Sequence, residues 1–185
     1  MRKTFYFIMS LFILVMAFSC KDNKPKSVLS EVEAAGDSVS TGDSTVYGIM
    51  VEGGMNSIVL LTDHGDTLEY LVNPNDTFEV VKGGKIDGDR FAIIGYKEYG
   101  DHFMRSAINL TTLLGNWTSL DRNFEIKEDG TVTSSLQSEK NPWTAWKIWN
   151  GKFVLSKDTF DIESLGADSL SLENKSGLFV FTRGK

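Results

Sequence analysis

Two residue types that often carry protein chemistry are scarce in this chain. Its 185 residues include one cysteine, Cys20, and two histidines, His64 and His102. A single cysteine forms no disulfide within the chain, and neither histidine belongs to a spacing typical of a metal site, such as His-x-x-x-His. We therefore expect no bound metal, no cofactor and no cysteine-based redox switch.

Sequence patterns of catalysis are also missing. The chain has no Gly-x-Ser-x-Gly turn that would present a nucleophile, and the acidic pair Asp87 and Asp89 lies in a glycine-rich segment where turn formation explains it. His64 falls in a tight turn and His102 in the segment after "KEYG", so both are expected to be solvated loop residues. The sequence predicts that the protein is not an enzyme.

The chain has one long apolar run, at its beginning. Arg2 and Lys3 precede "FYFIMSLFILVMAFS", Cys20 follows it, and the next residues are the charged "KDNKPK". The run is shorter than the roughly 20 residues that cross a bilayer, which favours a secretory signal over a membrane-spanning helix. Because "MAFSC" resembles the bacterial lipobox, we expect residues 1–19 to be a lipoprotein signal peptide. The alternative is an ordinary signal peptide with a chance cysteine.

Cys20 is then the expected point of attachment to the membrane. Acyl chains stabilise membrane binding by about 0.8 kcal/mol for each buried CH2 group, so several chains on one cysteine give a stable anchor. Residue 21 is lysine, and Asp22 comes one place later than the aspartate that retains enterobacterial lipoproteins in the inner membrane. By this analogy the outer membrane is favoured. The sequence leaves open whether the protein faces the periplasm or the surface.

The segment that follows the cysteine is polar and lacks aromatic residues. Residues 20–44 are rich in Ser, Asp, Glu and Lys, which predicts a disordered linker. Residues 1–19 carry two basic groups and no acidic group, so their removal lowers the net charge from −6 to −8. An acidic protein is a poor partner for nucleic acid or for anionic lipid.

No long helical period occurs after the linker, which indicates an all-β body in two parts. In the first part, residues 45–110, short apolar or alternating runs predict strands at 45–51, 56–62, 66–72, 90–97 and 103–110. A hairpin turn at Asp63-His64-Gly65 joins the second and third runs. Five strands with a longer excursion before the fourth predict a small OB-like barrel.

The second part, residues 113–185, predicts eight short strands that close into an up-and-down barrel. Its runs cover 115–120, 123–127, 131–135, 145–149, 152–157, 159–163, 169–173 and 178–183. The pair Asn150-Gly151 predicts a two-residue hairpin in which Trp149 faces Lys152 and Ile148 faces Phe153. Trp146, Ile148, Phe153 and Leu155 would then share the inner face.

The ordered motifs "LLGNWTS", "KEDGTV", "WKIWNGK", "ADSLSLE" and "FVFTR" resemble the lipocalin-like domain of Bacteroidetes lipoproteins over about 70 residues. An OB-like module beside a lipocalin-like one is also similar to the NlpE-like envelope lipoproteins, whose enterobacterial members have the opposite domain order. The resemblance implies a structural barrel end at which Gly115 precedes Trp117 and Arg183 covers the Trp117 ring. The Cys-x-x-Cys motif of NlpE-like proteins is absent here.

The tryptophans Trp143, Trp146 and Trp149 allow two interpretations. In the first, Trp146 belongs to the core and the other two lie at the barrel rim. In the second, the barrel is a carrier that holds a small apolar ligand in a cavity lined by Trp143, Trp146, Ile148 and Phe153. Eight-stranded barrels hold one small ligand or none.

Taken together, the sequence predicts a non-catalytic lipoprotein, anchored through Cys20 to the cell envelope, that acts in binding, assembly or envelope sensing. Its expected partners are the membrane and either envelope proteins or a small apolar ligand. A carrier of a small hydrophobic ligand is the alternative function.

Overall fold

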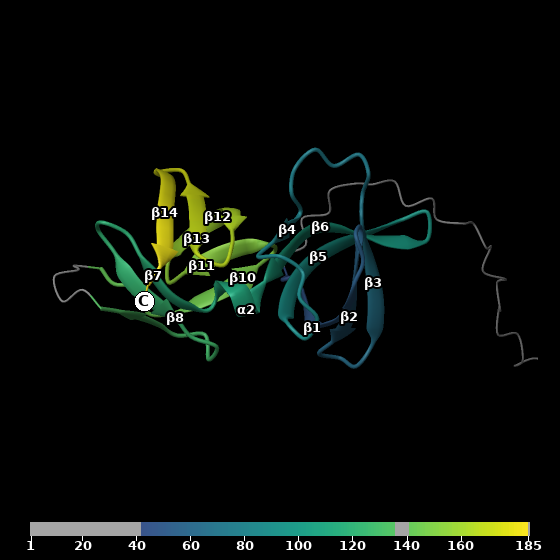
Figure 1. The fold of residues 1–185 in the computed structure, drawn as a ribbon, viewed down its shortest axis with the longest axis horizontal. Coiled ribbons are helices and arrows are strands. Elements are labelled where there is room, and N and C mark those ends of the chain that lie inside the picture. Colours follow the sequence, from purple (N-terminus) through teal and green to yellow (C-terminus); the bar gives the residue numbers. More distant parts are fainter. Residues whose placement is uncertain (1–41, 136–140, 185) are drawn as a thin grey trace, which may run out of the picture. The chain divides into compact units, whose positions relative to one another are not determined.

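The computed structural model describes residues 42–135 and 141–184, which form two β-barrels joined by one helical turn (Figure 1). The predicted signal peptide, Cys20 and all but the last residues of the predicted linker lie outside the described residues. Within the described ranges, no helix has the length and apolar character needed to cross a membrane.

The first barrel has the strand pairing of an OB fold. Strand β1 pairs with β2 and β5, β2 pairs with β3, β5 pairs with β6, and a parallel pairing of β3 with β6 closes the barrel. A two-residue strand, β4, adds to the other side of β6. The strands are β1 (Val46–Gly53), β2 (Ser57–Thr62), β3 (Thr67–Val72), β4 (Val81–Lys82), β5 (Arg90–Glu98) and β6 (Asp101–Asn109).

The interior of the first barrel follows from the alternation of apolar residues along its strands. Its buried cluster consists of Met50, Ile58, Leu60, Tyr70, Phe91, Ile93, Met104 and Ala107. The turn between β2 and β3 lies at Asp63-His64-Gly65 as predicted, and Gly65 has φ of 91°. Its positive φ is the conformation that glycine adopts without steric cost.

The second barrel is an eight-stranded antiparallel meander. Each strand pairs with the next except β9 with β10, and the last strand pairs with the first. One bridge between Thr131 and Ala145 links the β9 and β10 edges. The strands are β7 (Gly115–Thr118), β8 (Asn123–Ile126), β9 (Val132–Ser134), β10 (Trp146–Trp149), β11 (Lys152–Leu155), β12 (Asp158–Leu165), β13 (Ser169–Asn174) and β14 (Gly177–Arg183). The predicted fold class, an OB-like barrel followed by a lipocalin-like barrel, is confirmed.

The Asn150-Gly151 hairpin sets the predicted register. Trp149 pairs with Lys152, Ile148 with Phe153 and Trp146 with Leu155. Asn150 and Gly151 have φ of 49° and 75°, as a type I′ turn requires at both central positions. The turn chemistry therefore decides which side chains of β10 and β11 face the core.

The two barrels share one apolar cluster. Ala92 and Ile108 of the first barrel, together with Leu110 and Leu113 of helix α2 (Leu110–Leu113), belong to the same buried cluster as the second barrel's interior. The second barrel contributes Trp117, Phe124, Ile126, Val132, Trp143, Ile148, Phe153, Leu155, Phe160, Ile162, Leu165, Leu170, Leu172 and Phe181. The barrels thus pack on each other.

Several details differ from the sequence prediction. Trp143, expected at the rim, is 5% exposed and lies in the core, where its ring meets Phe124 and Phe160 edge-on. It precedes β10, so strand alternation does not determine its direction.

His102 lies in β6 rather than in a loop, because β5 and β6 extend to a tight turn at Tyr99-Gly100. Leu110 begins α2 instead of ending a strand.

Candidate functional site

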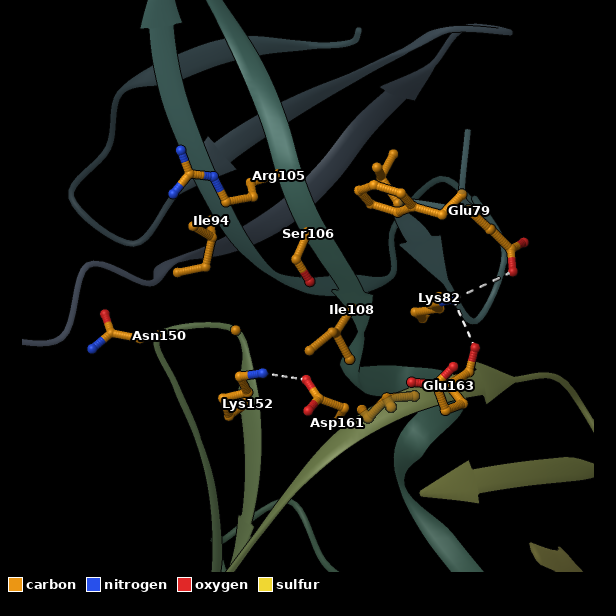
Figure 2. Close-up of a pocket in the computed structure, with 14 residues that line it drawn as sticks. Glu79, Lys82, Ile94, Arg105, Ser106, Ile108, Asn150, Lys152, Asp161 and Glu163 are labelled. Carbon is orange, nitrogen blue, oxygen red and sulfur yellow. Dashed lines mark hydrogen bonds and ion pairs between the residues drawn. The ribbon is translucent and has the colours of Figure 1, made fainter. Parts of the chain in front are cut away.

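A cleft of about 430 Å3 lies where the first barrel meets the second (Figure 2). Ligand sites commonly measure about 300 to 1,000 Å3, so the cleft has room for a small molecule. Its walls come from β4 and the residues before it, β5 and β6 on one side, and from the β10–β11 hairpin and β12 on the other. The lining residues are Phe78, Glu79, Val80, Lys82, Ile94, Arg105, Ser106, Ile108, Asn150, Gly151, Lys152, Asp161, Ile162 and Glu163.

Two β-bulges place charged residues on these walls. In β6, Ser106 pairs with Ile94 and Met104 pairs with Gly95, which leaves Arg105 as an extra residue. In β12, Ile162 pairs with Leu172 and Ser164 with Ser171, which leaves Glu163 as an extra residue. Bulges redirect side chains and are over-represented next to active sites. Each barrel therefore contributes one bulged, charged residue to the same cleft.

Lysines and carboxylates that line the cleft contact one another. The Lys82 side chain is 18% exposed, and its ammonium group donates a hydrogen bond of 2.7 Å to the Glu163 carbonyl oxygen. It also lies 3.8 Å from the Glu79 carboxylate. Lys152 forms an ion pair with Asp161 across neighbouring strands. Lys82 therefore joins the first barrel to the second, and Lys152 joins two neighbouring strands of the second barrel.

The side chains of Arg105 and Glu163 do not take part in these ion pairs. Among the described residues, neither side chain forms an ion pair. The Arg105 guanidinium carbon lies 5.5 Å from the centroid of the Tyr96 ring, a cation–π contact that leaves its N–H donors available. The cleft thus has one guanidinium and one carboxylate free to bind a ligand.

A hydrogen-bonded clamp holds the hairpin that forms one end of the cleft. The Asp43 carboxylate accepts hydrogen bonds from the Asn150 backbone N–H at 3.0 Å and from Thr45 N–H and Oγ1 at 3.0 and 2.6 Å. The Asn150 side-chain oxygen accepts from Ser44 N–H at 2.8 Å. Nearby, the Tyr47 hydroxyl donates to the Ile148 carbonyl at 2.9 Å. The residues before β1 therefore fix the second barrel's hairpin against the first barrel.

The Asp43 carboxyl is held in its charged form. Partial burial raises its pKa, but the hydrogen bonds from Thr45 and Asn150 and the charge of Lys147 together outweigh that effect, so the pKa lies below its ordinary value. A carboxyl with a lowered folded-state pKa stabilises the fold above its unfolded pKa. That contribution is lost as the pH falls through the folded pKa.

We predict that Asp43→Ala lowers the free energy of unfolding by about 0.5 to 1 kcal/mol at pH 7, allowing for solvent exposure of the group. The difference from the parent should shrink as the pH falls below the unfolded-state pKa of about 4 and then through the lower pKa of the folded parent. Urea unfolding at pH 7 and pH 3 measures it.

Asp129→Ala is the matched control, because Asp129 accepts the same two hydrogen bonds, from Thr131 N–H and Oγ1, within one turn. Equal effects of the two variants would contradict a role for Asp43 in clamping the barrels together.

Gly115, Trp117 and Arg183 lie together next to α2. Trp117 is fully buried, its indole N–H donates to the Leu113 carbonyl at 2.8 Å, and the Arg183 guanidinium carbon lies 4.0 Å from its ring centroid. Arg183 also donates to the carbonyls of Thr112, Leu114 and Ala167. Gly115 has φ of 109°, and a Cβ there would approach the Arg183 guanidinium to 3.0 Å. These residues hold the barrel closed beside α2.

The residues proposed to line a ligand cavity pack on one another. Trp143, Ile148 and Phe153 belong to the same buried cluster as Trp117, and Trp146 packs against that cluster. The indole N–H groups of Trp143 and Trp146 are bound to the Asp158 carboxylate at 2.8 Å and the Lys127 carbonyl at 2.6 Å. Trp149 is 40% exposed, in agreement with its predicted outward direction.

The two histidines lie in different elements. His64 is exposed in the β2–β3 turn, and His102 packs against Tyr70 with ring centroids 5.7 Å apart. Within residues 42–135 and 141–184, no three His, Cys, Asp or Glu side chains are grouped to hold a metal ion.

The sequence prediction missed the cleft entirely. Arg105 and Glu163 occur in runs of strand character, and strict alternation gives no sign that either is an extra residue in a bulge. The glycine-rich segment "KGGKIDGD" is the nearest sequence signal, since it forms the turns after β4.

Comparison of the chain with models of known protein families, with curated proteins and with solved structures finds no match.

Proposed function

We propose that the protein is a non-catalytic, lipid-anchored protein of the cell envelope, in the outer membrane, that binds a ligand or partner between its two barrels. The anchoring part of the proposal rests on the basic start, the apolar run and Cys20 at its end. The binding part rests on one observation: two bulged, oppositely charged residues from different barrels line one cleft and have no ion-pair partner among the described residues.

The packing of the second barrel favours binding outside it rather than transport within it. A carrier of a small hydrophobic molecule needs a connected apolar cavity, and Trp117, Ile148 and Phe153 instead form one packed cluster. Native mass spectrometry of the protein purified from membranes tests the carrier alternative. Phe153→Trp places a larger side chain in the barrel interior and should expel a lipid bound there. A stoichiometric lipid that remains bound to this variant would therefore lie outside the barrel and would argue against the carrier alternative.

The anchor predicts a specific labelling result. A Cys20→Ser variant should lose essentially all labelling by palmitate and leave the membrane fraction, because no other residue of the chain is a cysteine. Labelling in cells followed by fractionation measures both properties.

A Ser19→Thr variant serves as the control, since it alters the same segment and keeps the thiol. Palmitate labelling that persists in Cys20→Ser, or membrane binding that survives it in high salt, would contradict the proposed anchor.

A further inference from the structure

The charges of the cleft are balanced. Three cationic side chains line it, Lys82, Arg105 and Lys152, and three anionic ones, Glu79, Asp161 and Glu163. Two lysines and two carboxylates already contact one another, so the remaining pair is one guanidinium and one carboxylate. A ligand of one sign would leave one of these groups uncompensated. A ligand with both signs matches them.

The two remaining charges are separated by a surface of mixed polarity that includes isoleucine side chains. Figure 2 shows Arg105 and Glu163 on opposite sides of the pocket, with Ser106 and Ile108 between them. Ile94, Ile108 and Ile162 also line the cleft; Ile108 and Ile162 are buried, and Ile94 is partly exposed. A ligand that spans from one charge to the other would therefore place hydrocarbon against Ile94.

Both charged residues are held by neighbours, Arg105 at its guanidinium and Glu163 at its backbone. Tyr96 packs under the Arg105 guanidinium, whose planar donors suit a carboxylate bound through two hydrogen bonds. The Glu163 backbone is fixed by the hydrogen bond from the Lys82 ammonium group. Arg105 belongs to the first barrel and Glu163 to the second. The distance between the two charges therefore depends on how the barrels pack together.

We propose that this cleft binds a small zwitterion with an apolar side chain, of the class of a short peptide with free termini. The ligand carboxylate contacts Arg105, its ammonium group contacts Glu163, and its hydrocarbon contacts Ile94 on the wall that Ile108 and Ile162 support from behind. This inference rests on the proposed binding role of the cleft and specifies its ligand class.

The test uses leucyl-leucine and two analogues, N-acetyl-leucyl-leucine, which lacks the ammonium group, and leucyl-leucine amide, which lacks the carboxylate. Calorimetric titration of the full-length protein in detergent should show the parent zwitterion binding about tenfold more tightly than either analogue, a difference of about 1.4 kcal/mol. Arg105→Gln should abolish the preference for the free carboxylate and keep the preference for the free amine. Glu163→Gln should do the converse.

Lys175→Gln is the control, because it removes one charge at an exposed turn between β13 and β14 and should leave all three affinities unchanged. Unchanged unfolding midpoints establish that each variant is folded. Three results would overturn the proposal. The folded parent does not bind leucyl-leucine, it binds all three compounds with equal affinity, or neither substitution changes its preferences. Palmitate labelling reports anchoring separately, so a protein that is labelled but does not bind the peptide loses this inference alone.

Discussion

Trp117→Ala should lower the free energy of unfolding by about 3 to 5 kcal/mol, the range for removal of a large buried aromatic side chain. The indole is fully buried and its N–H is hydrogen-bonded to the Leu113 carbonyl. Its loss opens a cavity in the core that both barrels share and removes the ring that Arg183 covers. Denaturant unfolding followed by circular dichroism gives the change.

Trp149→Ala is the matched control for this prediction. The same side chain is deleted at a position that is 40% exposed, where the loss should stay below about 1 kcal/mol. Trp117→Phe should fall between the two, since it keeps part of the packing and loses the hydrogen bond. If Trp117→Ala costs no more than Trp149→Ala, the position of Trp117 in the shared core is wrong.

Asn109→Ala is expected to cost about 2 to 4 kcal/mol, because a buried side chain with three hydrogen bonds is lost at the joint between the barrels. The Asn109 amide donates to the Asp89 carboxylate at 2.7 Å and to the Gly84 carbonyl at 3.3 Å. Its oxygen accepts from Thr112 N–H at 2.9 Å and caps α2. The substitution leaves the Asp89 carboxylate without this donor.

Two further substitutions make the Asn109 prediction specific. Asn174→Ala removes one local hydrogen bond, to Ser176 N–H in a turn, and should change stability by less than about 1 kcal/mol. Asn109→Asp keeps the cap but places a second carboxylate next to Asp89, so it should also destabilise the protein at pH 7. Equal stability of Asn109→Ala and the parent would show that the joint does not depend on this residue.

Local sequence patterns determined the strands of both barrels. Alternating apolar residues and glycine-containing turns predicted thirteen runs, each of which overlaps a strand of the structure. The Asn150-Gly151 pair predicted a register that the structure confirms. These features are predictable because a hairpin depends on residues within a few positions of one another, so the sequence itself contains all of the interacting partners.

The resemblance to lipocalin-like domains predicted one longer-range contact, that of Arg183 with Trp117. Strand alternation alone predicted nothing about this pair, since it does not say which residues of the first and last strands face each other. The register of β14 with β7 pairs Arg183 directly with Trp117. The α2 turn then supplies the carbonyls that the guanidinium binds.

Only the tertiary structure decided the position of Trp143, the clamp between Asp43 and Asn150, and the cleft with Arg105 and Glu163. Asp43 and Asn150 are 107 residues apart, and the two bulges are defined by pairing with partner strands. The sequence by itself therefore determined an acidic, all-β protein with two barrels and an apolar start that ends in Cys20. The cleft arises from the packing of one barrel on the other, and no local pattern encodes it, because its walls join residues that are distant along the chain.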